Sequence, residues 1–419
     1  MTPALTRRQS LALALGCCAV PSWASGMRLT VAAFPAIDAI VREALPAWNK
    51  LNPHVPVNVV SRQSADHHVA MTTALSTSAH LPDLMAVEVS YIGRFAQGRG
   101  LQDLRVAPYS VQQLQHRVVP YALAQATNGR GEIVGVPTDI GPGTLLYRQD
   151  LLDRAGVTHA ELTQSWDSYV EAGKRLKAKA GAYLLSHARD LKDIMIRTGI
   201  QPGEGLYFNT RNEVLVGTPR FQRAFQLARE VRRHKLDAKV IAWSSDWSEG
   251  FRRGTVTTDI RGAWLAGHMN TWIAPTTRGL WRASQLPEAA FAAYGGTFYA
   301  LPRAGDPARK QVAWALLQLL TLDRGLQLQA FKRHDAFPAL VETFGDPFFD
   351  EPIAFLGGQQ ARQLWRDAAQ RIPQVAVHKQ DAFAEEVIDT ELDQVLLRGK
   401  DIEQALADAE RLLRQRATR

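Results

Sequence analysis

GVPTDIGPGTLLYRQDLLDRAG, residues 135–156, interrupts a chain that is regularly patterned on both sides. Its Gly-Pro and Pro-Gly steps loosen an apolar run, which then continues as a helix. Val134, Val136, Leu145 and Leu146 flank these steps, whereas a surface turn would have polar flanks. The chain has 419 residues, too many for one ordinary core, so we expect two domains.

Before this stretch, short apolar runs alternate with amphipathic segments. The runs at 27–34, 55–62 and 83–89 have the pattern of buried parallel strands, and the segments at 36–53 and 66–78 have that of helices. This alternation predicts a doubly wound α/β sheet. Ligands of such sheets bind at the carboxyl ends of the strands, which here are residues 34–38, 61–66 and 88–91.

The N-terminus has the pattern of an export signal. Arg7 and Arg8 precede a short apolar run, and Ser22-Trp23-Ala24 ends it with a small-x-small cleavage pattern. We therefore expect residues 1–24 to be removed from a periplasmic protein, by the twin-arginine or the general secretory route. Both cysteines, Cys17 and Cys18, lie in this segment, and lipidation at one of them stays open. The mature chain then has no thiol for a disulfide, a nucleophile or a metal site.

Charge and motifs exclude several classes of protein. The formal net charge is +8, but the basic residues are dispersed at helical spacing, unlike those of a nucleic-acid-binding protein. The sequence has no G-x-S-x-G, Walker, G-x-G-x-x-G or H-E-x-x-H motif. His67 and His68 are interpreted as a solvated surface pair on a helix, not as metal ligands. We expect no catalytic residue, no metal and no cofactor.

Several segments in order resemble one family. These are WNKLNPHVPVNVV (48–60), LPDLMAVEVSYIGRFAQGRGLQDL (81–104), VGVPTDIGPGTLLYRQDLLDRAGV (134–157), SWDSY (165–169), YGGTFYALPR (294–303), AFPAL (336–340) and FLGGQQARQLWRDAAQRIP (355–373). Together they are similar to the extracellular solute-binding proteins (family 1) of carbohydrate ABC importers, especially the lactose- and arabinose-type branch.

The resemblance implies a two-lobed, type II-like periplasmic binding protein fold, with a ligand cleft between lobes joined by about three hinge crossovers. Residues 135–143 are then one crossover, and the others fall at 294–298 and 333–339. The N-terminal lobe takes residues 27–137 and 297–338, and the C-terminal lobe takes 140–293 and 340–419. The implied function is capture of a mono- or oligosaccharide by a monomer and its delivery to an inner-membrane ABC permease.

A sugar site needs flat aromatic rings beside planar polar side chains. Five of the ten tryptophans lie between Trp243 and Trp281, whereas Trp314 and Trp365 have the surroundings of core residues. Glu88 and Asp139 each end an apolar run, where helix capping is the alternative to ligand binding. The predicted ligand-binding residues are Phe34, Asp38, Glu88, Tyr91, Asp139, Trp243, Trp264, Gly295, Gly296, Thr297 and Asp335.

Two departures from the family pattern bear on this site. Arg148 follows Tyr147 where Asn is usual, which alters a helix start, and Asp335-Ala336 replaces a usual Gly at a cleft edge. The second leaves the ligand's identity open. A phosphorylated polyol, such as glycerol 3-phosphate or its diesters, is one alternative ligand, because the chain is basic. A secreted polysaccharide-active enzyme is the alternative from another class.

Overall fold

The computed structural model describes residues 26–417, so the predicted export segment, with Cys17 and Cys18, lies outside the described residues. The chain divides into two compact units. Unit 1 comprises residues up to Asp139 together with Gly296–Thr343, and unit 2 comprises Ile140–Gly295 together with the chain from Phe344 onward. The first change of unit lies inside the quoted stretch, the second inside the segment 294–298, and the third four residues beyond the segment 333–339.

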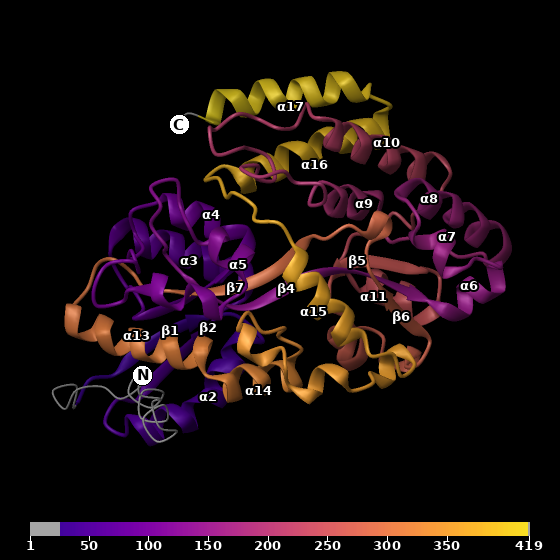
Figure 1. The fold of residues 1–419 in the computed structure, drawn as a ribbon. Helices are drawn as coiled ribbons and strands as arrows, with labels where there is room; N and C mark the ends of the chain where they lie inside the picture. The colour runs from indigo at the N-terminus through magenta and orange to yellow at the C-terminus, as the bar shows by residue number, and fades with distance from the viewer. Residues whose placement is uncertain (1–25, 418–419) are drawn as a thin grey trace, which may run out of the picture. The chain divides into compact units, whose positions relative to one another are not determined.

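Unit 1 is built on a sheet in the order β2, β1, β3, β7. The strands β1, β2 and β7 are labelled in Figure 1. The strands β1 (Leu29–Ala33), β2 (Val57–Ser61) and β3 (Leu84–Glu88) are parallel, as predicted, and β7 (Ala293–Ala300) is antiparallel to β3. The helices of unit 1 are α2 (Ile37–Leu51), α3 (Ser64–Thr77), α4 (Val89–Gln97), α5 (Pro120–Gln125), α13 (Pro307–Leu322) and α14 (Arg324–His334).

The quoted stretch forms regular structure. Val136–Arg148 is one continuous strand, β4, although it contains Pro137, Gly141, Pro142 and Gly143. The expectation of a loosened segment is therefore wrong, and its role as a hinge stays a prediction. Within unit 2, β4 pairs antiparallel with β5 (Thr258–Gly262) and β6 (Trp281–Ser284), so its extended backbone is held by neighbours on both sides.

Besides the strands β4, β5 and β6, unit 2 is mainly helical. Arg148 directly precedes the first helix of the unit, and its side chain donates two hydrogen bonds to the Asp150 carboxylate, at 2.8 Å each. Arg148, which stands where the family usually has Asn, therefore does lie at a helix start. The helices are α6 (Gln149–Ala155), α7 (His159–Thr163), α8 (Trp166–Arg175), α9 (Ala188–Met195), α10 (Pro219–Arg233), α11 (Ser245–Arg253), α12 (Leu265–His268), α15 (Ala361–Arg371), α16 (Asp381–Arg398) and α17 (Ile402–Ala417).

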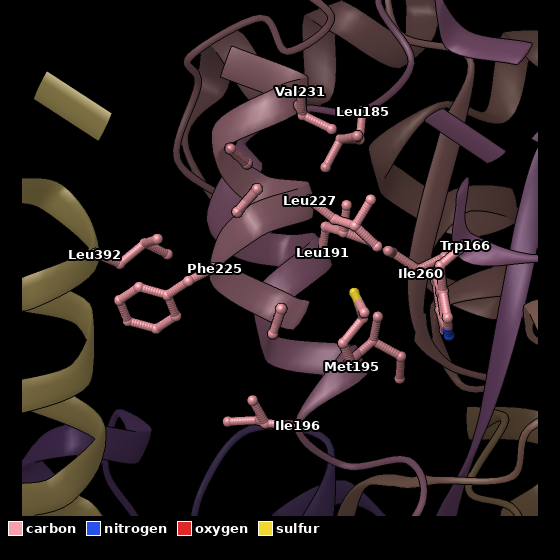
Figure 2. Close-up of a cluster of buried hydrophobic side chains, with 14 of the residues drawn as sticks. Trp166, Leu185, Leu191, Met195, Ile196, Phe225, Leu227, Val231, Ile260 and Leu392 are labelled. Atoms are coloured by element: carbon pink, nitrogen blue, oxygen red, sulfur yellow. The ribbon is translucent and has the colours of Figure 1, made fainter. Parts of the chain in front are cut away.

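Each unit has its own hydrophobic core. In unit 2, Phe225 of α10 and Leu392 of α16 face each other, while Leu191 of α9 and Ile260 of β5 belong to the same cluster (Figure 2). Trp314 in unit 1 and Trp365 in unit 2 are buried, which confirms their interpretation as core residues. Among residues 26–417, no helix is both long enough and apolar enough to cross a membrane.

Candidate functional site

In unit 1, three of the predicted residues lie on the neighbouring strands β3, β7 and β4. Glu88, the last residue of β3, is directly opposite Thr297 of β7. Asp139 of β4 hydrogen-bonds with Thr297, and the charge of Glu88 acts on its carboxyl group. The Glu88 carboxylate accepts the Ser90 backbone N–H at 3.0 Å and caps α4, and ligand binding by Glu88 stays a prediction beside this capping role. Asp139 lies in a strand and caps no helix.

The Asp139 side chain has an unsatisfied oxygen. Burial raises the pKa of its carboxyl group to about 6, the hydrogen bond from Thr297 lowers this pKa, and the nearby Glu88 raises it. Within the described part of the chain, Asp139 Oδ1 is buried without a hydrogen-bond partner, and so are the hydroxyls of Tyr121 and Tyr299. Burial raises the pKa of both tyrosines, and the Asp139 charge raises it further. A buried acceptor of this kind is costly unless another group donates to it.

A group of aromatic rings is linked to Glu88 through His68. His68 stacks on Tyr91, with ring centroids 3.9 Å apart and planes 9° apart, and Phe34 lies 5.4 Å from the His68 ring. His68 Nε2 accepts the Glu88 backbone N–H at 3.0 Å, and burial lowers its pKa to about 4. The interpretation of His67 and His68 as a solvated pair is wrong, because both are fully buried and His67 bonds the Ala86 carbonyl.

Two other predicted residues of unit 1 lie at helix ends. Asp38 is in the first turn of α2, 4.0 Å from Arg42. Asp335 ends α14 with φ of 53°, a left-handed conformation that Asp tolerates and that explains why Gly is usual there.

In unit 2, glycine backbone packs closely against the edge of the Trp264 indole. Its indole N–H donates to the Tyr294 carbonyl at 2.8 Å, and its ring is partly exposed. A Cβ atom at Gly295 would lie 2.6 Å from Trp264 Nε1, and one at Gly262 would overlap the same atom. A Cβ atom at Gly141, in the quoted stretch, would overlap the Tyr294 carbonyl. These glycines are needed because the backbone passes so close to the indole edge.

Trp264 is part of a larger aromatic group, which we call the indole array: Trp264, Trp243, His268 and Trp272. The Trp243 ring lies nearly parallel to Trp264, at 5.8 Å and 18°, and to Trp272, at 6.3 Å and 24°. His268 lies 5.6 Å from Trp264 and 5.9 Å from Trp272. Trp243 and Trp272 are 53% and 51% exposed. The array therefore presents flat apolar rings to solvent.

Sequence reasoning missed part of this array. His268 and Trp272 follow Trp264 at intervals of four residues, a helical spacing that could have indicated a shared face. The buried Trp247 packs against the indole array. Its ring centroid lies 5.1 Å from that of Trp243, and the Arg261 guanidinium lies 5.4 Å from the Trp247 centroid. Arg261 is in turn paired with Asp190 and Asp259.

In residues 26–417, no group of three or more His, Cys, Asp or Glu side chains could hold a metal ion.

A family model of bacterial extracellular solute-binding proteins matches residues 43–342. The chain belongs to this family. The curated lactose-binding protein of Rhizobium radiobacter is 25% identical over 392 residues, covering 88% of this chain and 87% of that protein. The arabinooligosaccharide-binding protein of Halalkalibacterium halodurans is 29% identical over a shorter segment, 36% of this chain and 34% of that protein.

Solved structures of binding proteins share the fold. An extracellular solute-binding protein of family 1 superposes with a TM-score of 0.80 at 23% identity, covering 94% of this chain and all of that chain. A binding protein of B. animalis subsp. lactis, solved with β-1,6-galactobiose, gives 0.74 at 21% identity, covering 93% of this chain and 97% of that one. The predicted α/β, two-lobed binding-protein fold is confirmed by these likenesses.

Proposed function

We propose that this chain is the substrate-binding receptor of an ABC importer, which captures a mono- or oligosaccharide in the periplasm and delivers it to a membrane permease. The names of its curated relatives support a carbohydrate, and support neither a phosphorylated polyol nor a polysaccharide-active enzyme. Because those relatives are binding proteins, we propose that the chain binds its ligand without chemical change. Export, the permease and a monomeric state belong to the same proposal.

The fixed, partly exposed indole of Trp264 is the observation that carries this proposal. Sugar rings have apolar C–H faces, which pack on flat aromatic rings. An indole that is tied at its nitrogen and enclosed by glycines keeps one orientation, so little conformational freedom is lost on binding. In unit 1, we propose that Glu88, Thr297 and the unsatisfied Asp139 Oδ1 accept or exchange hydrogen bonds with sugar hydroxyls.

A thermal-shift screen with mono-, di- and phospho-sugars first finds a ligand, because binding raises stability by mass action. Titration calorimetry then compares Trp264→Ala and Trp264→Phe with the wild type. We expect Trp264→Ala to reduce affinity by more than about tenfold, which corresponds to about 1.4 kcal/mol, and Trp264→Phe to reduce it less.

Trp365 provides the matched control. It is buried in the core of the same unit, with its indole N–H donating to the Thr144 hydroxyl at 3.1 Å. Trp365→Ala should lower the free energy of unfolding by about 3–5 kcal/mol and leave the affinity of the folded protein intact. If Trp264→Ala behaves in the same way, Trp264 is a core residue and the proposed sugar contact is wrong.

A further inference from the structure

The indole array is larger than a single stacking residue requires. Successive ring centroids from Trp264 through Trp243 to Trp272 are 5.8 and 6.3 Å apart, with the planes within 24° of parallel. A six-membered sugar ring covers about one indole. The indoles of Trp243 and Trp272 therefore offer apolar surface in addition to the one sugar ring that Trp264 can cover.

The backbone holds Trp243 in a conformation that bulky residues avoid. Its φ is 71°, in the left-handed region, and a bulky residue keeps this strained conformation only where its surroundings enforce it. The flanking chain does enforce it: Val240 N–H donates to the Ser186 carbonyl at 3.0 Å, and the Ser244 hydroxyl donates to the Ile241 carbonyl at 2.8 Å. Strain maintained at a half-exposed indole indicates that its position has a use.

Trp272 is tied to the same part of the unit. It lies in the π-helical turn η4 (Met269–Ile273), and its carbonyl accepts Arg252 Nη2 of α11 at 3.1 Å. The helix α11 begins directly after Ser244, which also accepts the Trp247 N–H at 3.1 Å. One helix thus fixes the loop that carries Trp243 and the turn that carries Trp272, so the two outer indoles are positioned before any ligand arrives.

We propose that Trp243 and Trp272 form an outer stacking subsite that holds a second sugar ring, so that the ligand is an oligosaccharide of at least two rings and not a monosaccharide. This inference rests on the proposed function and extends it, because it names the length of the ligand. Continuity with Trp264, through two nearly parallel ring contacts, argues for a sugar as the occupant of this exposed surface. A protein partner would not require parallel rings.

The test compares sugars of increasing length on the wild type and on Trp272→Ala. Titration calorimetry uses galactose, lactose and β-1,6-galactobiose as one series, and arabinose, arabinobiose and arabinotriose as another. In the wild type, affinity should rise at least about tenfold from one ring to two. In Trp272→Ala this gain should fall by about fivefold or more, while the affinity for any monosaccharide that binds stays unchanged.

Leu397→Ala is the control, because it removes an exposed apolar side chain from α16 of the same unit. It should leave the length dependence as it is. Trp272→Phe should restore part of the gain lost in Trp272→Ala. Since Trp272 is half exposed, both variants should fold, and their thermal unfolding verifies this.

The outcomes separate this inference from the proposed function. If no sugar of either series binds the wild type, the proposed function fails and this inference fails with it. If sugars bind but a monosaccharide binds as tightly as its oligomers, or if Trp272→Ala keeps the full gain with length, the outer subsite alone is overturned. Light scattering provides one further outcome: a wild-type dimer that Trp272→Ala dissociates would assign the surface to a second copy of the chain and overturn the subsite.

Discussion

The candidate residues of the two units differ in kind. Those of unit 1 are mainly polar: Glu88 and Thr297 opposite each other on paired strands, with the carboxyl group of Asp139 bonded to Thr297. Those of unit 2 are aromatic rings, held by glycines and by the buried Trp247. Carboxylates discriminate between ligands by the position of hydroxyl groups, whereas rings respond to the size and flatness of a ligand. The two sets therefore contribute differently to binding.

The two units also differ in what their candidate residues cost the free protein. In unit 1 the cost is electrostatic, because Asp139 is a partly buried acid with a raised pKa, and its buried Oδ1 has no hydrogen-bond partner. In unit 2 it is conformational, because Trp243 has a positive φ. Residues that destabilise the free protein are expected where function requires them. Each cost can be measured as the change in the free energy of unfolding when the residue that causes it is replaced.

Among the variants of the proposed binding residues, Asp139→Asn should have the largest effect on stability. The Asp139 pKa is raised from 3.8 to about 6 in the folded protein. The acid thus stabilises the fold below about pH 4, and this stabilisation is lost as the pH rises through 6. At pH 7.5 the ionised form costs about 3 kcal/mol, so the neutral amide should raise the free energy of unfolding by up to that amount. At pH 4 the gain should shrink to less than about 1 kcal/mol, and sugar affinity at pH 7.5 should fall.

Asp237→Asn is the control for this prediction. Asp237 is fully buried, but Arg232 bonds its carboxylate, at 2.7 Å for the closest contact. Removing that charge leaves the Arg232 guanidinium without its carboxylate, which typically costs about 3–5 kcal/mol. Chemical denaturation of both variants at pH 4 and 7.5 gives the comparison. If Asp139→Asn destabilises the protein at pH 7.5, Asp139 is a satisfied structural residue and the proposed role in unit 1 is wrong.

Gly262→Ala tests whether the close packing of glycine against the Trp264 indole matters for binding. The added Cβ would overlap Trp264 Nε1 and the Tyr294 carbonyl, so the indole has to move. We expect a loss of about 1–3 kcal/mol in stability and a loss of about tenfold in sugar affinity. Gly345→Ala, in the same unit, adds a Cβ atom that meets nothing within 4 Å and should change neither quantity. Unchanged affinity in a folded Gly262→Ala protein would show that the orientation of Trp264 does not matter for binding.

Parts of this arrangement could be predicted from sequence, and others depend on packing. The parallel strands of unit 1 follow from apolar runs alternating with amphipathic helices, and this local pattern is visible in one dimension. The burial of His67 and His68 is not, because it depends on a bond to Ala86 and a stack on Tyr91. The sequence around Gly141 predicts a loosened segment, whereas in the structure this glycine leaves room for the Tyr294 carbonyl. Such close approaches join residues distant in sequence, which no local pattern records.

The smallest effects on stability are expected at two residues with a positive φ, one in each unit. Ser78 in unit 1 ends α3 with φ of 57° and is exposed, whereas Trp243 in unit 2 has φ of 71° within the indole array. Glycine relieves a left-handed conformation at either position. We expect Ser78→Gly to raise the free energy of unfolding by less than about 1 kcal/mol without any change in sugar affinity, because its strain only ends a helix.

Trp243→Gly should relieve strain as well, but it removes the ring that links Trp264 with Trp272. Its stability should therefore change by no more than about 1 kcal/mol in either direction, while its affinity for a disaccharide falls by about tenfold or more. Denaturation and calorimetry on the two variants distinguish strain that ends a helix from strain that positions a ligand contact. Equal affinities in Trp243→Gly and Ser78→Gly would place both residues in the first class, and the indole array would then be packing without a ligand.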